Sequence, residues 1–207
     1  MVDSSHSDAQ TGKTIAVVLP IKAFEQAKDR LSSVLTSSQR KHLAQTTALG
    51  VIEAARDAHV FVVCDNDEVA LWATSHGATV VPQIDSGLNA AVREGVAATY
   101  GYERVMIVHS DIPLPNGLGD LLSAQVADNT VVIVPDRHQD GTNVLVIPTN
   151  CKFDFHYGAK SFNAHVAEAK KLGLEIQIIN DDELALDIDT PDDLHALPAQ
   201  WLQQHGI

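Results

Sequence analysis

A single carboxylate stands directly after a strongly apolar segment of the chain. Residues 105–108 (VMIV) have no polar side chain, and the polar corner His109-Ser110-Asp111 follows them. An unbroken apolar run with β-branched residues is typical of a strand buried on both faces, as in a parallel sheet covered by helices. Asp111 is therefore predicted at the carboxyl end of a strand, where open α/β sheets bind ligands and a carboxylate suits a hard cation with phosphates. The alternative is that Asp111 only caps the following turn.

A second acidic motif, LALDIDTPDDL, lies near the C-terminus. Asp187 and Asp189 are two positions apart, so on an extended segment both side chains point to the same side and can hold one cation together. Thr190 is expected to cap the helix that follows, and the positive end of that helix explains Asp192 and Asp193. Asp187 and Asp189 have no such structural explanation, which favours a ligand role.

Basic residues gather after the first predicted strand. Six of the fourteen Lys and Arg residues lie between Lys13 and Lys41, although the whole chain has a formal net charge of −13. Lys22, Lys28 and Arg30 stand close together there and could hold a triphosphate, with lysine as a mobile point charge and arginine as a planar fork. A solvated loop or helix face is the alternative.

Three further corners offer donors for anions. Residues 87–89 (GLN) enter a predicted helix and can present backbone and amide donors to a base edge or a phosphate, or can form an ordinary cap. The corner Asp140-Gly141-Thr142-Asn143 offers an open backbone, a hydroxyl and an amide, which suits oxyanion binding. Gly158 followed by Ser161 at a helix start would supply free N–H groups to a phosphate or carboxylate, unless Ser161 is only a cap.

Strands and helices alternate along the chain that positions these residues. Ser37-Ser38 is the expected N-cap of the longest helix, and residues 65–67 are expected to cap another. The corner at residues 140–143 predicts a hairpin and an antiparallel strand within an otherwise parallel sheet. Strands are expected over residues 14–19, 59–64, 78–81, 105–108, 130–134, 144–147 and 174–179. Helices are expected over residues 39–58, 89–100, 116–127 and 161–172, and a short helix is expected to run from the cap at residues 65–67 through residues 72–76.

Composition limits the class of protein. The 207 residues are 45% hydrophobic and 20% charged, which suits one soluble α/β domain over residues 14–207 behind a disordered, polar leader of residues 1–13. No apolar run is long enough to span a membrane, and no signal peptide is evident, so a cytoplasmic location is expected. The acidic balance disfavours nucleic acid as a partner. Cys64 and Cys151 are expected as free thiols, and zinc is not expected.

The alternation predicts a mostly parallel, doubly wound α/β sheet. The chain lacks G-x-G-x-x-G after its first strand and G-x-x-x-x-G-K-[ST], so dinucleotide-binding oxidoreductases and P-loop enzymes are disfavoured. Basic residues after strand one, an acid after a central strand and a late acidic pair remain. This is the layout of a metal-dependent nucleotidyl transferase.

Six segments in order resemble the 2-phospho-L-lactate guanylyltransferase family, which includes the bacterial phosphoenolpyruvate guanylyltransferases of coenzyme F-420 biosynthesis. They are LPIKAFEQAKDRL, GLNAAVREG, VHSDIP, VPDRHQDGTNVLVI, FHYGAKSFNAH and LALDIDTPDDL, and the resemblance extends over residues 14–197. The resemblance implies a nucleotide-diphospho-sugar transferase-like fold, similar to the molybdenum-cofactor guanylyltransferases. Asp29 stands where a threonine commonly precedes the arginine.

The resemblance also implies roles for the residues singled out above. Lys22, Lys28 and Arg30 would hold the GTP phosphates, and Asp111 would bind magnesium together with the later acidic pair. The remaining positions divide between the two substrates: Gly87, Leu88 and Asn89 would lie near the guanine, Thr142, Gly158 and Ser161 would bind the phosphorylated three-carbon acid, and Asp187 and Asp189 would complete the magnesium site.

The chemistry that this resemblance implies is transfer of GMP. A phosphate oxygen of the acid attacks the α-phosphorus of GTP and pyrophosphate leaves. Because this nucleophile is already an anion, no Ser or Cys nucleophile and no catalytic histidine is expected. The sequence leaves open whether the acid is phosphoenolpyruvate, 2-phospho-L-lactate or 3-phosphoglycerate, whether the chain forms an oligomer, and whether a downstream enzyme takes the product. The alternatives are another nucleotidyl transferase of this fold, using CTP or a sugar phosphate, and a non-catalytic GTP-binding protein.

Overall fold

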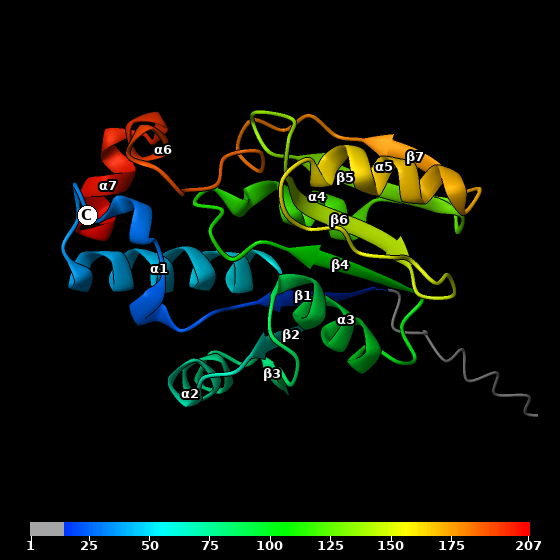
Figure 1. The fold of residues 1–207 in the computed structure, drawn as a ribbon, viewed down its shortest axis with the longest axis horizontal. Coiled ribbons are helices and arrows are strands. Elements are labelled where there is room, and N and C mark those ends of the chain that lie inside the picture. Colours follow the sequence, from blue (N-terminus) through cyan, green and yellow to red (C-terminus); the bar gives the residue numbers. More distant parts are fainter. Residues whose placement is uncertain (1–14) are drawn as a thin grey trace, which may run out of the picture.

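The computed structural model describes residues 15–207. The predicted leader, residues 1–13, lies outside them. The described part folds around one seven-stranded sheet with the strand order β3-β2-β1-β4-β6-β5-β7 (Figure 1). The strands are β1 Ile15–Pro20, β2 His59–Cys64, β3 Thr79–Pro82, β4 Arg104–Val108, β5 Thr130–Pro135, β6 Thr142–Pro148 and β7 Glu175–Ile178.

The pairing confirms a mostly parallel, doubly wound sheet. β1 pairs in parallel with both β2 and β4, while β6 runs antiparallel between β4 and β5. The predicted antiparallel strand is therefore present, but it begins at Thr142 rather than Val144. The strand starts earlier because Asp136 closes the turn: its carboxylate accepts hydrogen bonds from the backbone N–H groups of His138, Asp140 and Gly141. The strand can therefore begin at the next residue, Thr142.

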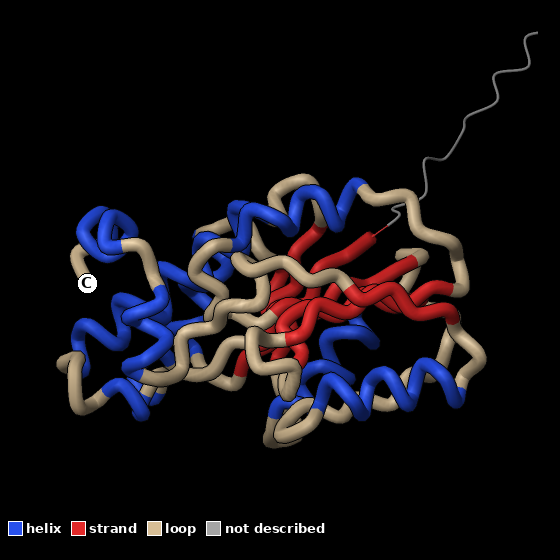
Figure 2. The backbone as a smooth tube through the Cα atoms, turned by 90° about the horizontal axis from the view of Figure 1, so that it is seen from above, coloured by secondary structure: helices blue, strands red, loops and turns tan. Residues whose placement is uncertain are grey.

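Helices cover both faces of the sheet, and the sheet lies between them in Figure 2. One face packs on residues of α1, α2 and α4, and the other packs on residues of α3 and α5. Close approach is needed on the second face, because a Cβ on Gly95 would lie 2.5 Å from Val18 Cγ1. The α-helices are α1 Ser37–Ala54, α2 Asp67–Ser75, α3 Leu88–Ala98, α4 Leu118–Ser123, α5 Ser161–Lys171, α6 Pro191–Ala196 and α7 Ala199–His205.

Two helix predictions need correction. α1 is capped by Thr36 rather than by Ser37-Ser38, because Gln39 stands three residues after Thr36 and completes a capping box with it. The helix expected over residues 116–127 is only a 3₁₀ turn, Pro115–Gly117, followed by the short α4. Its two glycines, Gly117 and Gly119, lower the helix propensity of this segment. The cap at residues 65–67 is confirmed, since Asn66 accepts the N–H of Val69.

A third, smaller core joins the loop after β1 to the C-terminal segment of the chain. Leu31 packs there with Ile188, Leu194 and Trp201, next to the start of α1. Leu31 ends the second of two 3₁₀ turns after β1, Phe24–Gln26 and Asp29–Leu31. This core holds the early basic loop against the late acidic segment, although about 160 residues separate them.

The same sheet order creates a crevice at the centre of the molecule. The chain winds from β1 outward to β2 and β3, then returns to place β4 on the other side of β1. In open α/β sheets, ligands bind at such a reversal, outside the carboxyl ends of the strands. Within residues 15–207, no helix is long and apolar enough to cross a membrane. Cys64 and Cys151 are both free thiols, as expected.

Candidate active site

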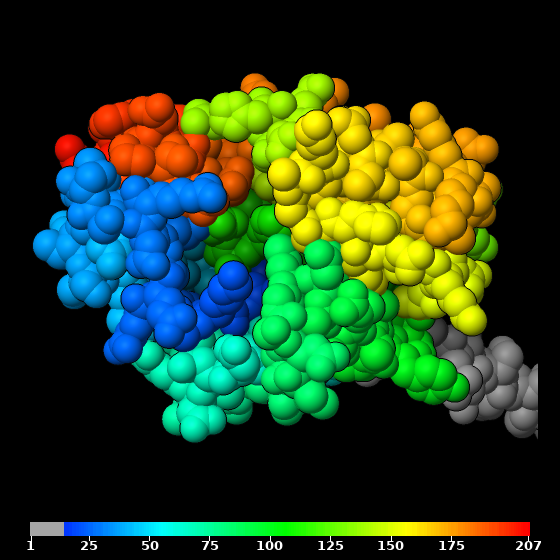
Figure 3. All heavy atoms as spheres, viewed as in Figure 1, coloured from blue at the N-terminus to red at the C-terminus, as the bar shows by residue number. Residues whose placement is uncertain are grey.

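The reversal between β1 and β4 holds a pocket of about 390 Å³. Figure 3 shows it as a hollow between the early loop, in blue, and the central segments, in green. Its walls come from the segments that follow β1, β3 and β4 and from the late acidic segment. Among the predicted site residues, the lining includes Lys22, Lys28, Gly87, Leu88, Asp111, Asp187 and Asp189.

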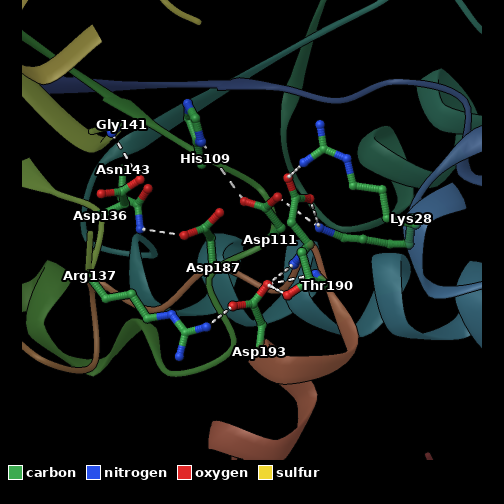
Figure 4. A network of polar contacts seen from close by, with 12 residues as sticks. Lys28, His109, Asp111, Asp136, Arg137, Gly141, Asn143, Asp187, Thr190 and Asp193 are labelled. Carbon is green, nitrogen blue, oxygen red and sulfur yellow. Dashed lines mark hydrogen bonds and ion pairs between the residues drawn. The ribbon is translucent and has the colours of Figure 1, made fainter. Parts of the chain in front are cut away.

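Lys28 is the centre of the charged part of this pocket. Its Nζ lies 2.7 Å from Asp111 Oδ2 and 3.5 Å from Asp189 Oδ1 (Figure 4). The residue has a left-handed backbone, with φ of 61°, and its side chain is only 7% exposed. Burial alone would lower the pKa of Lys28, but the negative charges of Asp111 and Asp189 outweigh burial and raise it. Lys28 therefore stays protonated and neutralises part of the acidic cluster.

The three predicted carboxylates share one wall of the pocket. Burial, and then the negative charges of Asp111 and Asp189, raise the pKa of Asp187 to about 6. Burial also opposes ionisation of Asp111, yet Lys28 and His109 lower the pKa of this carboxyl below its usual value. Asp111 Oδ1 is buried and has no hydrogen-bond partner among the described residues. Lys28 thus neutralises only part of this wall, and Asp111 Oδ1, 4.0 Å from His109 Nδ1, is left without a hydrogen bond from the described residues.

These observations bear on whether a cation fits the wall. The donors are carboxylate oxygens, the type that Mg²⁺ prefers, and the unpaired Oδ1 of Asp111 is available to one. The set is not preorganised: in the part of the chain that the structure describes, no three His, Cys, Asp or Glu side chains already form a metal-binding group. The chemistry of the site suits a divalent cation, which would replace the missing positive charge.

Lys22 and Arg30 occupy different places. Lys22 lines the pocket. Arg30 does not; its side chain is 75% exposed, and its Nη1 lies 3.6 Å from Asp189 Oδ2. Two of the three predicted basic residues therefore face the pocket, and Arg30 stands outside it, next to the acidic pair.

The predicted nucleotide-contacting residues are also divided. Gly87 and Leu88 line the pocket, and Gly87 precedes α3 with φ of 98°, which favours glycine. Asn89 is engaged elsewhere: its Nδ2 donates to Tyr157 O at 3.0 Å, and its Oδ1 accepts the Tyr157 N–H at 2.7 Å. Asn89 thus anchors residues 151–160 to α3 with both atoms of its amide.

Thr142, Gly158 and Ser161 do not line this pocket but lie together beside it. Thr142 starts β6 and is fully buried, and Ser161 starts α5 and is 2% exposed. The free N–H groups expected at this helix start are not free: Ser161 N–H donates to Gly158 O, and Phe162 N–H donates to Asp140 O. Ser161 is also not the cap, because the left-handed Lys160 takes that position. The Thr142 hydroxyl is hydrogen-bonded to His165.

Two supports of the acidic segment were not predicted. Asp193 Oδ2 accepts the backbone N–H groups of Asp189 and Thr190, while its Oδ1 is paired with Arg137. This arrangement confirms the cap expected at Thr190 and extends it to Asp189 (Figure 4). Asn143 Nδ2 donates to Leu184 O and lies 3.4 Å from Asp187 Oδ1.

The sequence indicates the roles of these supporting residues to different degrees. It places Asn143 in the Gly-Thr-Asn corner and offers its amide there, but it does not predict the contact with Asp187. Asp193 was explained only by the positive end of α6, and Arg137 stands alone in the hairpin turn with nothing in its spacing that points to Asp193.

Solved structures of other proteins share this fold. A nucleotidyl transferase from Methanothermobacter superposes with a TM-score of 0.67 at 15% identity, over 93% of this chain and all of that one. The 4-diphosphocytidyl-2C-methyl-D-erythritol synthase from Anaerococcus prevotii gives 0.58 at 13% identity, over 93% and 97%. These likenesses establish the shared fold.

Sequence comparison is more specific. The family described as guanylyl transferase CofC like matches residues 15–200. The phosphoenolpyruvate guanylyltransferase of Conexibacter woesei is 37% identical over 87% of this chain and 85% of its own length, and that of Sphaerobacter thermophilus is 34% identical over 89% and 92%. The 2-phospho-L-lactate guanylyltransferase of Methanocaldococcus jannaschii is 28% identical over 88% and 82%. The chain belongs to the family of CofC-like guanylyl transferases.

Proposed function

We propose that this protein transfers GMP from GTP to the phosphate of a three-carbon phospho-acid and releases pyrophosphate, as a step in coenzyme F-420 biosynthesis. The observation that supports this most is the convergence of Lys22, Lys28 and three carboxylates on one pocket at the reversal of the sheet. Membership of the guanylyl transferase family supports this reaction.

GTP occupies the pocket in this proposal. Its volume lies within the range of about 300–1,000 Å³ that small-molecule sites have. Lys22 and Lys28 bind the phosphates, Arg30 reaches them from outside, and Gly87 and Leu88 lie near the guanine. Lys28 can do this by exchanging its bond to Asp111 for bonds to phosphate oxygens, which are equally good acceptors for an ammonium group.

Magnesium is proposed as the cofactor, held by Asp111, Asp187 and Asp189. When bound, it would neutralise phosphate charge and so allow two anions to approach one another. Asp111 Oδ1, which has no hydrogen-bond partner among the described residues, supports a divalent cation here, and so does the buried Asp187, whose pKa is raised by burial and by the neighbouring carboxylates.

The chain's own groups then have limited tasks. The acceptor phosphate is already an anion, so no residue has to remove a proton from it. Positioning and charge stabilisation are the main contributions of proteins to such transfers. Lys22 and Lys28 stabilise the charge that develops on the leaving pyrophosphate, and Asp193 holds the backbone of Asp189 in place.

Phosphoenolpyruvate is the proposed acceptor, bound in the corner of Thr142, Gly158 and Ser161. The bacterial relatives at 37% and 34% identity are named for this acid, whereas the relative named for 2-phospho-L-lactate is 28% identical. The reaction is placed in the cytoplasm, which two free cysteines support, because reducing compartments keep thiols free. A downstream enzyme is proposed to receive the product; the oligomeric state is left open.

The test is pyrophosphate release from GTP and Mg²⁺ with phosphoenolpyruvate, 2-phospho-L-lactate or 3-phosphoglycerate in separate reactions, with CTP in place of GTP as the control. Release with GTP and phosphoenolpyruvate alone is expected. Release with CTP would favour another nucleotidyl transferase of the same fold. GTP binding without release for any acid, even with a downstream F-420 enzyme added, would favour a non-catalytic GTP-binding protein.

A further inference from the structure

Tyr157 has a buried hydroxyl group with nothing to bind. The residue is 8% exposed, and its Oη has no hydrogen-bond partner among residues 15–207. A buried donor without a partner is costly, and native proteins contain few of them. Burial also raises the pKa of Tyr157, so the proton stays on Oη and the group remains a donor.

Its neighbours place the Tyr157 ring between the two groups of predicted site residues. On one side, the Tyr157 ring lies 5.4 Å from the ring of His109, which lines the pocket and has its own unpaired, buried Nε2. On the other side, it packs edge-on at 4.8 Å against His165, the partner of Thr142. The next residue in the chain is Gly158.

The backbone around Tyr157 is fixed although its hydroxyl is not. Asn89 binds both the N–H and the carbonyl of Tyr157. His165 accepts the N–H of the preceding residue, His156, at 3.1 Å. Side chains from two helices, α3 and α5, therefore hold the backbone at Tyr157 in place, which favours a well-positioned contact with a ligand.

We infer that Tyr157 is a substrate-binding residue whose Oη donates a hydrogen bond to an anionic oxygen of the phospho-acid. The inference rests on the proposed function and adds to it a contact that joins the pocket to the Thr142 corner. Because Oη is buried in the free protein, the side chains that cover it must shift as the acid binds. Side-chain rearrangements are common when ligands bind.

The test is Tyr157→Phe, which removes only the oxygen. Because that oxygen has no partner in the free protein, the melting temperature should stay within about 1 °C of the parent value or rise. The KM for phosphoenolpyruvate should rise about tenfold, as expected for a lost hydrogen bond to a charged group. The KM for GTP should not change.

Tyr102→Phe is the matched control. Tyr102 is equally buried at 8%, but its hydroxyl is hydrogen-bonded to His59 Nδ1 at 2.6 Å. This variant should lose about 2–4 °C in melting temperature and keep the parent KM for both substrates.

Three results would overturn the inference. An unchanged KM for the acid in Tyr157→Phe would show that Oη does not contact it, and a fall in melting temperature like that of Tyr102→Phe would show a structural partner instead. An equal rise in the KM for GTP and for the acid would show a general disturbance. A parent protein that releases no pyrophosphate with any acid would instead refute the proposed function, and this inference with it.

Discussion

The Lys28 ammonium lies 2.7 Å from Asp111 Oδ2, although 83 residues separate the two along the chain. The contact joins the loop after β1 to the end of β4, across the reversal of the sheet. It also places a positive charge on the same carboxylate that we propose as a magnesium ligand. Lys28 and the cation therefore depend on the same acidic wall, and this dependence can be tested.

Lys28→Met should destabilise the protein in the absence of magnesium. Removing one partner of a buried ion pair leaves the other charge uncompensated, which costs about 3 kcal/mol or more. Added Mg²⁺ should recover part of this loss, because it would supply charge to the same carboxylates. Urea unfolding with and without Mg²⁺ measures both effects. Arg30→Met is the control. It removes a charge from a side chain of the same loop that is 75% exposed, so the free energy of unfolding should change by less than about 1 kcal/mol.

Asp111→Asn should sharply reduce pyrophosphate release in a protein that still folds, although breaking its pair with Lys28 should also lower the free energy of unfolding. The amide keeps the shape of the side chain but removes the negative charge that Lys28 and a divalent cation need. A fall of at least about a hundredfold in kcat is expected for the loss of one electrostatic contact in the transition state. Asp120→Asn, on the exposed face of α4, should keep the parent rate. Near-normal turnover by Asp111→Asn would contradict the assignment.

Asn89→Ala should affect the acid more than the nucleotide. The Asn89 amide is hydrogen-bonded to the backbone of Tyr157. Removing this amide should therefore loosen residues 151–160 rather than remove a contact to guanine. We expect a rise in KM for phosphoenolpyruvate of about tenfold, the size of one or two lost hydrogen bonds, with a smaller change for GTP. Initial-rate kinetics with each substrate varied in turn separate the two. A larger effect on GTP would instead restore Asn89 to the guanine site.

Asp193→Asn should weaken the acidic segment from behind. Asp193 does not line the pocket, yet its carboxylate accepts the N–H groups of Asp189 and Thr190 and is paired with Arg137. Burial alone would raise the pKa of Asp193, but these hydrogen bonds and the charge of Arg137 lower it. The variant should lose about 1–3 kcal/mol of stability, as for a hydrogen-bonded charge, and bind Mg²⁺ more weakly. Urea unfolding and Mg²⁺ titration measure these losses; Asp192→Asn, at an exposed position beside it, should show neither.

The sequence predicted the parts of this site that depend on local pattern. The run at residues 105–108 specified a buried strand, so the position of Asp111 at its carboxyl end followed directly. The spacing of Asp187 and Asp189 likewise placed both carboxylates on one pocket. The capping box at Thr36 was also readable, since Gln39 stands at the required distance, but the adjacent serines obscured it.

Tertiary packing determines the positions of site residues that the local sequence pattern does not predict. The position of Lys28 depends on its own left-handed backbone and on the third core around Leu31. This core brings the loop after β1 next to the C-terminal helices. No spacing predicts that Arg137 meets Asp193, because their contact depends on how the hairpin turn lies against α6. Tyr157 gave no signal either, since an aromatic residue in a loop is far more often part of a core than of a binding site.

Acid should destabilise this protein partly through His165. The residue is fully buried, and burial, with smaller contributions from His156 and His109, lowers its pKa to about 4 from the usual 6.5. Between these two values the unfolded chain binds a proton that the folded protein does not. The contribution of neutral His165 is therefore complete above about pH 6.5 and is lost as the pH falls toward 4, up to about 3 kcal/mol in total.

The free energy of unfolding, measured by urea at several pH values, should fall along this range. In His165→Asn that part of the slope should disappear, whatever the overall stability of the variant, while His138→Asn, at an exposed position, should retain it. A parent slope that His165→Asn leaves unchanged would mean that other groups control the acid sensitivity and that His165 titrates alike in both states.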